Sequence, residues 1–507
     1  MTPDNPGHTA VDEPFDVAII GYGPVGATLA NLLEREGRRV LVLEQFPQSY
    51  PLPRATHIDG EAMRVLQSAG IGEDLEPLLG VYARMRFEDA QGRMLIDWPR
   101  PITPGIHGWR DSNRFHQPDL EHALQARIAR SSLVTVRRGL RLTGLDQNEL
   151  GVTLVARDET GEPWSAQARY VVGCDGANST VRALIGAELT VLAPSQQWLV
   201  ADFILNPGAP ELPEGTVQYC DPARPFTYIE GAGRRRRWEV MLLPGDDPAT
   251  FARPDQVYPL LQRWVSPDHV VLERAVVYVF RSAIASRWRN GRVMIAGDAA
   301  HQTPPFLGQG LCAGLRDVIN LAWKIDLALT GTADPDLLDS YQQELAPHVT
   351  QYIAEANRIG GFIAETDPDK ARERDAMLLS SPHVMTPIRP RLGGGLRGQN
   401  ANPLAGTLAA QPRLRADRRL DDLVGLHFAV LVTARLAARF TPAMHDRLRA
   451  AGAVVLEGNG DEYLATLGAE AVIIRPDHYI FGTAGTFAEA EALIAALPVV
   501  TVTRHDG

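Results

Sequence analysis

The stretch Val17-Ala-Ile-Ile-Gly21-Tyr-Gly23-Pro-Val-Gly26, followed by Val40-Leu-Val-Leu-Glu44, decides the fold of this chain. The apolar run that opens it has the length and the β-branched content of a buried parallel strand. Gly21 allows a sharp turn, Gly23 leaves room for a pyrophosphate beside the backbone, and Gly26 lets the next helix lie close to the strand. A strand, three glycines, a helix, a second strand and an acid about 20 residues further on predict a dinucleotide-binding βαβ unit.

The residues around these glycines are expected to hold the cofactor. The helix offers free N–H groups and the positive end of its dipole to phosphates, so Pro24 and Val25 at its start are predicted contacts. Gly37 is expected to end the helix. The second strand brings Glu44, with Gln45 beside it, to the edge of the site. The Glu44 carboxylate can accept both hydroxyls of an adenosine ribose and would repel a 2′-phosphate.

Composition narrows the class of protein. The 507 residues suggest two to four domains, and 50 basic against 61 acidic residues argue against a general nucleic-acid surface. The run Arg234 to Arg237 is expected to be a solvated loop that opens a strand. Cys174, Cys220 and Cys312 have no metal-ligand spacing and fit a reduced cytoplasmic protein without disulfides. No signal pattern opens the chain and no apolar run reaches about 18 residues, so neither export nor a membrane is expected.

Hydrophobic periodicity divides the chain into segments of an α/β fold. Short alternating runs with turns, typical of antiparallel strands, interrupt the nucleotide-binding domain twice. A Gly- and Pro-rich stretch then precedes a last α/β domain of about 100 residues. The expected segments are 15–80, 111–189 and 282–384 for the nucleotide-binding domain, 81–110 and 190–281 for an inserted antiparallel sheet that binds substrate, 385–412 for a linker and 413–507 for the last domain. Residues 1–14 are expected to be a disordered tail.

Two later motifs each follow a buried strand. In Val171-Val-Gly-Cys-Asp175-Gly-Ala-Asn-Ser179, Asp175 begins a turn and Ser179 can cap a helix, although an ordinary strand-to-helix turn would look the same. In Gly297-Asp298-Ala-Ala-His-Gln-Thr-Pro-Pro305-Phe-Leu-Gly308-Gln309-Gly310, Asp298 can accept hydroxyls of a ribityl chain. The prolines form a rigid wall. The helix that starts near Leu311 would stabilise negative charge at the N1/O2 edge of a flavin.

The three motifs, in this order, resemble those of the single-component flavin aromatic hydroxylases, the family of para-hydroxybenzoate and phenol hydroxylases. The resemblance covers Phe15 to about Gly360. Segments Pro53 to Glu61, Trp109 to Asp111, Arg114 to Glu121 and Gln218 to Pro225 are similar to the branch that hydroxylates 3-(3-hydroxyphenyl)propionate. The segment Arg475 to Phe481 resembles the thioredoxin-like domain of phenol hydroxylases, here without redox cysteines, which implies a structural role or a homodimer contact.

The resemblance implies both cofactor and reaction. NADH or NADPH would reduce FAD, O2 would add at the flavin C4a to give a hydroperoxide, and the carbon ortho to a phenol would take up oxygen. The implied substrate is 3-(3-hydroxyphenyl)propionate or 3-hydroxycinnamate, converted to its 2,3-dihydroxy product in aromatic catabolism. Arg54 and Gln117 match flavin-contacting positions of the family.

Candidates for the catalytic residues follow from the same resemblance. Asp59 matches a carboxylate beside the substrate hydroxyl, and a buried carboxylate near an apolar ring would have a raised pKa and act as a general base. An equally good interpretation makes Asp59 the N-cap of a helix that begins before Ala62. His57 is a second candidate, and Tyr219 and Tyr228 on the inserted sheet could bond the phenol.

A substrate carboxylate would need a cation, because burying it alone costs several kcal/mol. Arg224 is the expected partner, with Arg54 and Arg110 as alternatives.

Two other functions share part of this pattern. A hydroxylase that tailors polycyclic aromatic (polyketide) metabolites would carry all three motifs and the last domain. A flavin-binding protein that is not an oxygenase, such as a halogenase, would carry the nucleotide motifs. The Trp-x-Trp-x-Ile run of flavin halogenases does not occur in the sequence.

Overall fold

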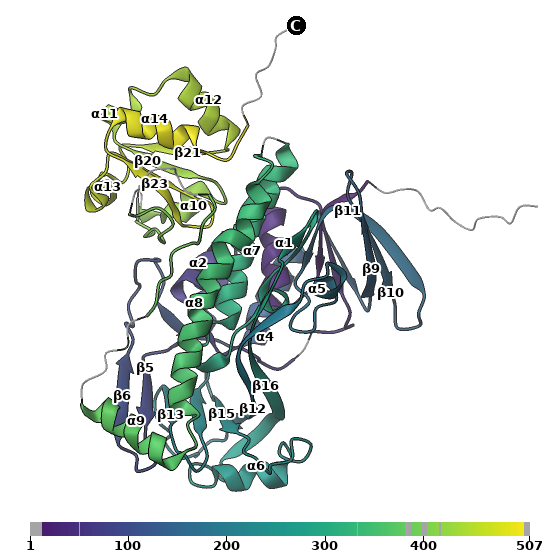
Figure 1. Cartoon of the computed structure of the whole chain (residues 1–507), viewed down its shortest axis with the longest axis vertical. Coiled ribbons are helices and arrows are strands. Elements are labelled where there is room, and N and C mark those ends of the chain that lie inside the picture. The colour runs from purple at the N-terminus through teal and green to yellow at the C-terminus, as the bar shows by residue number, and fades with distance from the viewer. Residues whose placement is uncertain are drawn as a thin grey trace, which may run out of the picture.

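The computed structural model describes residues 13–49, 51–331, 333–380, 385, 387–396, 403–414 and 417–500. Most of the predicted tail 1–14, parts of the predicted linker 385–412 and the last residues of the final domain lie outside the described residues. The described chain forms two eight-stranded sheets, a four-stranded sheet and a three-stranded sheet. Two long helices run between them (Figure 1).

The first large sheet is built outward from the glycine motif. Strand β1 (Phe15–Ile20) pairs in parallel with β2 (Val40–Glu44) and β11 (Pro163–Gly173), and helix α1 (Pro24–Arg35) connects β1 to β2. The apolar residues of β1 and β2 are almost fully buried, as expected for parallel strands covered on both faces. The remaining strands are β8 (Val134–Arg138), β9 (Arg141–Gln147), β10 (Val152–Arg157), β17 (Arg289–Asn290) and β18 (Val293–Ile295). The predicted βαβ unit is therefore confirmed.

The second large sheet joins strands from two distant parts of the chain. Its pairings are antiparallel except that β13 runs parallel to β5. The strands, in spatial order, are β19 (His301–Gln302), β16 (Val270–Ala285), β12 (Leu189–Leu205), β15 (Arg235–Met241), β14 (Phe226–Glu230), β13 (Thr216–Tyr219), β5 (Arg84–Glu88) and β6 (Met94–Pro99). The alternating runs before residue 110 and after residue 190 thus belong to one sheet.

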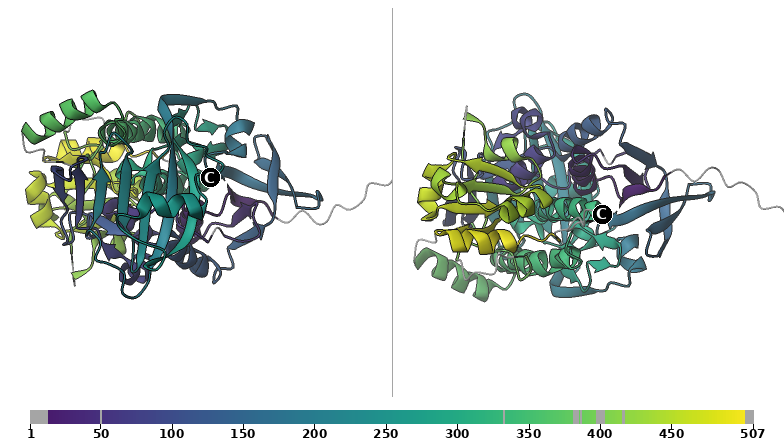
Figure 2. Two further views of the ribbon diagram at one scale, coloured as in Figure 1. Left: turned by 90° about the horizontal axis from the view of Figure 1, so that it is seen from below. Right: turned by 90° about the horizontal axis from the view of Figure 1, so that it is seen from above.

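The two faces of this sheet have different surroundings. On one face, Val217, Trp238 and Val240 pack against helix α6 (Pro254–Leu261), which crosses the sheet in the left view of Figure 2. Because side chains alternate along a strand, their sequence neighbours point to the opposite face. That face carries polar residues such as Gln218, Thr227 and Glu239 together with apolar residues such as Met85, and it looks toward the nucleotide-binding part.

Helices α7 (Gly310–Thr330) and α8 (Ser340–Ile363) are long and run between the sheets and the C-terminal domain (Figure 1). The helix that the sequence predicts near Leu311 is α7. A short 3-10 turn, Leu337–Asp339, precedes α8. Near the start of α7 lies the three-stranded sheet of β3 (His57–Asp59), β7 (Ser112–Arg114) and β4 (Gly80–Val81).

The C-terminal domain contains a sheet in the order β21-β20-β22-β23. Its first two strands are parallel and the other pairings are antiparallel. The strands are β20 (Ala429–Val432), β21 (Val454–Glu457), β22 (Ala471–Ile474) and β23 (Ile480–Ala484). Helices α10 (Leu420–Val424), α11 (Ala434–Ala437), α12 (Pro442–Ala450), α13 (Asp461–Leu467) and α14 (Phe487–Ala495) accompany them.

The other helices complete the nucleotide-binding part and its cover. They are α2 (Gly60–Ser68), α3 (Gly72–Leu75), α4 (Gln117–Ile128), α5 (Thr180–Leu184) and α9 (Pro368–Ser380). Helix α9, which the sequence did not predict, contacts β6. Within the described ranges, no helix is both long and apolar enough to cross a bilayer.

Candidate active site

The glycine motif has the local geometry that its sequence predicted. Gly21 has a φ of 102°, and a Cβ there would lie 2.4 Å from the carbonyl oxygen of Cys174. A Cβ at Gly26 would lie 2.1 Å from the Gly21 oxygen, so only glycine lets α1 approach the turn this closely. A Cβ at Gly23 would meet nothing within 4 Å. The start of α1 therefore faces open space, as a phosphate-binding helix end requires.

Two helix N-termini lie close together at this point. A Cβ at Gly314, in the first turns of α7, would lie 2.7 Å from a methyl group of Val25 in α1. Gln309 precedes α7, Leu311 lies in its first turn, and the turn Pro305–Leu307 leads to Gly308 in the left-handed conformation. The positive ends of both helix dipoles thus face one region, which suits a cofactor with a pyrophosphate and an electron-accepting ring.

The predicted acidic contacts lie at the rim of this region. Glu44 accepts hydrogen bonds from the backbone N–H groups of Tyr22, at 2.8 Å, and Phe46, at 2.9 Å. Gln45 next to it is exposed. Asp298 is exposed as well, yet the protein around it is dense enough to raise the pKa of its carboxyl. A carboxyl group can be exposed and still have a raised pKa when it lies in a recess of the protein surface. Asp298 is therefore accessible to a bound ribityl chain.

Three further predicted flavin contacts have mainly local partners. Gln117 accepts hydrogen bonds from the backbone N–H groups of Arg54, at 3.1 Å, and Ala55, at 2.9 Å. It thereby fixes the segment that carries Arg54. The positive charge of Arg54 acts against the burial that raises the pKa of Asp298. Asp175 accepts a hydrogen bond from the Val181 N–H at 3.0 Å and so also caps the helix after its turn. The residues of this region fit FAD.

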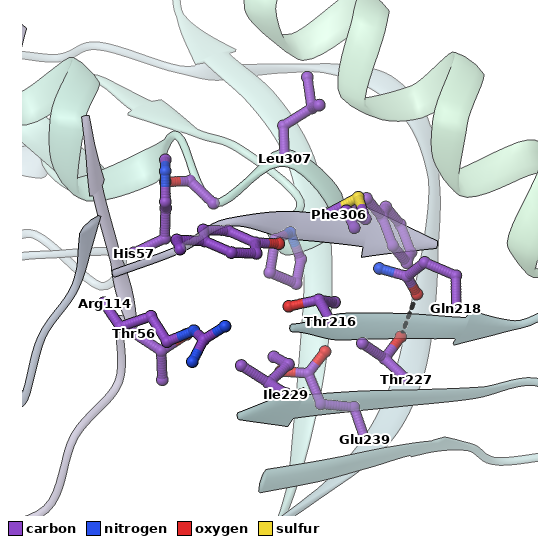
Figure 3. A pocket seen from close by; sticks show the side chains of 14 residues that line it. Thr56, His57, Arg114, Thr216, Gln218, Thr227, Ile229, Glu239, Phe306 and Leu307 are labelled. Carbon is purple, nitrogen blue, oxygen red and sulfur yellow. Dashed lines mark hydrogen bonds between the residues drawn. The ribbon is translucent and has the colours of Figure 1, made fainter. Parts of the chain in front are cut away.

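A small cavity separates the polar face of the second sheet from the Pro305–Gly308 loop. Its volume is about 40 Å³. Its polar lining, shown in Figure 3, comes from β3, β7 and the sheet strands, and includes Thr56, His57, Arg114, Thr216, Gln218, Thr227 and Glu239. Met85, Ile229, Phe306 and Leu307 contribute apolar surface. A pocket with apolar walls and a few converging polar groups is the usual form of a small-molecule site.

Glu239 is the group in this cavity that the sequence analysis missed. It lies on β15 between Trp238 and Val240, whose side chains point to the α6 core, so it must face the cavity. Burial raises the pKa of Glu239 to about 7, against the attraction of Arg237. The alternation within Arg236 to Val240 could have identified it. The expectation that Arg234 to Arg237 form a solvated loop before this strand is wrong for most of the run, because β15 begins at Arg235 and Arg237 is buried and paired with Asp202 at 2.7 Å.

His57 lies between the small cavity and a larger cavity of about 320 Å³. His57 and Leu307 line both cavities. Its Nε2 lies 3.1 Å from Ser112 Oγ and its Nδ1 lies 3.3 Å from the carbonyl oxygen of Gly308. Burial, together with the positive charge of Arg100, lowers the pKa of His57 to about 4. The ring is therefore neutral at pH 7 and tied to the loop beside the flavin.

The expectation that Asp59 has a raised pKa is wrong. Asp59 accepts a hydrogen bond from the Ala62 N–H at 2.8 Å, which makes it the N-cap of α2, and it pairs with Arg316 of α7 at 2.5 Å. Burial alone would raise its pKa, but the Arg316 charge and the Ala62 N–H outweigh burial and hold the pKa at about 2. A carboxylate with this pKa is a poor proton acceptor at neutral pH.

Tyr219 and Tyr228 do not reach the cavity. They alternate with Gln218 and Thr227, which line it, so their rings lie in the opposite core against Trp264 and Trp238. The expected roles of both tyrosines in binding the phenol conflict with this strand register.

Arg224 and its two alternatives also lie outside the cavities. Arg224 pairs with Asp246 at 2.6 Å, and it lines neither cavity. Arg110 donates to the Asn113 side chain at 3.0 Å, and neither it nor Arg54 appears in the cavity walls.

Arg100 lies in the wall of the larger cavity. Arg316 and Arg389 in the same wall pair with Asp59 and Asp111, whereas no carboxylate within the described ranges pairs with Arg100. Arg100 Nη1 donates to Ser112 Oγ at 2.8 Å, and its buried Nε has no hydrogen-bond partner. Burial lowers the pKa of this guanidinium, which stacks 4.0 Å from the ring centre of Trp98.

Comparison with known proteins agrees with this geometry. The FAD binding domain family matches residues 14–356. A probable NADH-specific resorcinol 4-hydroxylase from Rhodococcus jostii (strain RHA1) is 35% identical over 98% of this chain and 97% of its own length. A 3-(3-hydroxy-phenyl)propionate/3-hydroxycinnamic acid hydroxylase from Mycobacterium avium (strain 104) is 35% identical over 84% of this chain and 77% of its own.

Among solved structures, the flavin-dependent monooxygenase PieE in complex with FAD and substrate superposes with a TM-score of 0.80 at 22% identity. The match covers 96% of this chain and 99% of PieE. This likeness shows a common fold. The family match and the two relatives show the family. The chain belongs to the FAD-dependent aromatic hydroxylases, the flavoprotein monooxygenases that carry this FAD binding domain.

Proposed function

We propose that this enzyme hydroxylates a single-ring phenol that carries an anionic side chain, ortho to the hydroxyl group, with NADH and O2 as co-substrates. The substrate is 3-(3-hydroxyphenyl)propionate or its cinnamate analogue, and the product is the 2,3-dihydroxy compound. When bound, FAD accepts electrons from NADH and supplies the oxygen transfer to the ring.

The observation that carries this proposal is the unpaired guanidinium of Arg100. It lines the larger cavity, next to the His57 and Leu307 boundary with the smaller one. Ser112 Oγ bridges Arg100 and His57, so the cation lies close to the loop that holds the flavin. A half-buried cation without a carboxylate is partly desolvated, and a ligand that supplies the anion would offset that cost. The propionate group is that anion, and the ring then extends toward the small cavity.

Replacing Arg100 tests this assignment. Arg100→Met keeps the stem on Trp98 and removes the charge, so kcat/KM for 3-(3-hydroxyphenyl)propionate should fall about 10- to 150-fold, the loss expected for one hydrogen bond to a charged group. Arg100→Lys should retain part of it. Activity toward resorcinol, which has no carboxylate, should change little. An equal loss on both substrates would show that Arg100 shapes the cavity and does not recognise the anion.

A second candidate substrate is resorcinol itself. The full-length likeness to a relative named as a resorcinol 4-hydroxylase favours it. Resorcinol would leave Arg100 without an anionic partner, which is why the carboxylated phenol is preferred.

We also infer the domain arrangement. Residues up to about 384 form an FAD-binding part with an inserted sheet that binds the phenol, and residues after about 412 form a thioredoxin-like domain. The order β21-β20-β22-β23, with one parallel and two antiparallel pairings, supports that assignment for the last domain. Proteolysis that released residues 413–507 as a folded fragment would support the boundary, and cleavage within the sheet would contradict it.

A further inference from the structure

The polar face of the second sheet holds a carboxylate whose neighbours are already engaged. Glu239 is buried and lines the small cavity beside the flavin loop. Its nearest cation is Arg237, with 3.9 Å between Nη1 and Oε1, beyond hydrogen-bonding range. Among the residues that the structure describes, none donates a hydrogen bond to the Glu239 carboxylate.

Arg237 cannot easily move to satisfy Glu239. Its Nε and Nη2 bond to Asp202, and its Nη1 and Nη2 also donate to the carbonyl oxygens of Arg54 and Pro53 at 2.8 and 2.7 Å. Arg274 is held by the same Asp202 and by Pro53. These contacts fix the segment before His57 to the sheet. Both arginines are engaged with Asp202 and this segment, and neither donates a hydrogen bond to Glu239.

The opposite side of the cavity carries a matching positive group. Arg114 pairs with Glu230 through Nη1 at 2.7 Å, while its buried Nε and Nη2 have no hydrogen-bond partner. In Figure 3, Arg114 extends toward the pocket from the left and Glu239 lies at its lower edge, with Thr216 above Glu239. A proton acceptor and a free donor thus face one space.

We propose that Glu239 is the catalytic base of the hydroxylation and takes the proton of the substrate phenol. This inference rests on the proposed function. The phenolic O–H bond breaks, the proton moves to a Glu239 oxygen, and the electron pair stays on the ring oxygen, which makes the ortho carbon more nucleophilic. The ring carbon gains oxygen through the flavin and then loses its own proton to solvent, which restores the aromatic ring as a phenolate, and Glu239 returns its proton to the ring oxygen.

The acidity of the groups supports this role. A phenol has a pKa near 10, so only about one molecule in a thousand is ionised at pH 7. Burial raises the pKa of Glu239 to about 7, close to the value at which a base works best at neutral pH. The charged groups that face it are Arg237, Asp202 and Arg274, and His57 and Arg114 line the same cavity. His57, with a pKa of about 4, does not change charge in this range.

The experiment measures product formation against pH from 5.5 to 9 in the FAD-loaded wild type, Glu239→Gln, Glu239→Asp and Glu88→Gln. Glu88 lies on β5 of the same sheet, outside both cavities, and serves as the control. Wild type and Glu88→Gln should lose hydroxylation below a pKa near 7. Glu239→Gln should hydroxylate about 10²–10⁴-fold more slowly, and its pH profile should lack this acidic limb. NADH should still reduce the flavin, and a larger share of the NADH should be consumed without product. Glu239→Asp should keep the limb at a reduced rate.

Each result has a defined meaning. A Glu239→Gln enzyme with the wild-type rate and pH limb overturns the proposal. If Glu239→Gln fails to fold, an absence of the limb in Glu239→Asp overturns it, and its presence supports it.

A binding measurement separates this proposal from the proposed function, because it needs no turnover. Wild type should prefer 3-(3-hydroxyphenyl)propionate to its methyl ether about 10- to 100-fold, as read from the flavin absorbance, and Glu239→Ala should lose this preference. If no phenol is hydroxylated but the preference depends on Glu239, the proposed function fails while the contact stands. If the preference is unchanged in Glu239→Ala, Glu239 does not meet the hydroxyl.

Discussion

The hydroxyl of Tyr479, in the C-terminal domain, donates a hydrogen bond of 2.8 Å to the carboxylate of Glu61 at the start of helix α2. Glu61 pairs with Arg316 at 2.6 Å, and Arg316 also holds Asp59. Tyr479, Glu61, Arg316 and Asp59 all line the larger cavity. The C-terminal domain therefore forms part of the wall of the larger cavity.

Removal of this hydroxyl should affect substrate binding more than flavin binding. In Tyr479→Phe, Glu61 keeps Arg316 but loses a buried donor, and such a loss costs about 1–3 kcal/mol. We expect a higher KM for the carboxylated phenol and an unchanged Kd for FAD, measured by steady-state kinetics and fluorescence titration. Tyr463→Phe, in the same domain but outside the cavity, is the control. A change in FAD affinity that equals the change in KM would contradict a local role.

A buried ion cluster holds the C-terminal domain in place. Arg475 donates to Glu344 of α8 through both terminal nitrogens at 2.7 Å, and Lys324 of α7 reaches the same carboxylate at 2.7 Å. Arg475→Met should lower the free energy of unfolding by about 3–5 kcal/mol, because it leaves buried carboxylates without their main partner. Arg435→Met, which removes a pair whose arginine side chain is 81% exposed, should cost under about 1 kcal/mol. Urea unfolding followed by fluorescence compares them, and equal losses would refute the cluster's role.

Asp298 should be needed to retain FAD. Its side chain is accessible and lies near the start of α7, so Asp298→Ala removes a charge-assisted hydrogen bond worth about 1.5–3 kcal/mol. The Kd for FAD should rise about 10- to 150-fold, measured by fluorescence titration of the protein after removal of its flavin. Asp158→Ala, in the exposed turn after β10, should leave the Kd unchanged. A normal Kd in Asp298→Ala would mean that another group holds the ribityl chain.

Acid should destabilise the fold through buried histidines. Burial lowers the pKa of His57, His348 and His478 to about 4, below the usual 6.5. Between these values the unfolded chain binds protons that the folded chain excludes, so stability is complete above about pH 6.5 and falls as the pH drops toward 4. Each histidine should account for roughly 2 kcal/mol between pH 7 and pH 5. His348→Gln should reduce that loss, and an identical pH dependence in the variant would contradict it.

The parts of the fold that depend on local sequence could be predicted. The turn at Gly21, the close helix at Gly26, the helix that starts near Leu311 and the C-terminal α/β pattern all follow from short-range rules on glycine conformation and hydrophobic period. The start of α8 could not be placed, because the turn Leu337–Asp339 carries the same apolar period as the helix.

Long-range pairing and strand register explain the errors in the site. The partner of Asp59 is Arg316, 257 residues away, and no local pattern indicates that contact. Tyr219 and Tyr228 were expected in the cavity because their strands were not aligned with the sheet, and a shift of one residue reverses every side chain. Their neighbours Gln218 and Thr227, joined to each other by a hydrogen bond, occupy the cavity face.

The most direct experiment measures NADH oxidation, O2 uptake and product formation together, with 3-(3-hydroxyphenyl)propionate as substrate and resorcinol as comparison. We expect a yellow, FAD-containing protein that forms the 2,3-dihydroxy product with one NADH and one O2 consumed per product. We also expect a lower kcat/KM for resorcinol. Hydroxylation of resorcinol alone would contradict the assignment of Arg100 as the carboxylate partner. A failure to form hydroxylated product from either phenol would contradict the proposed function.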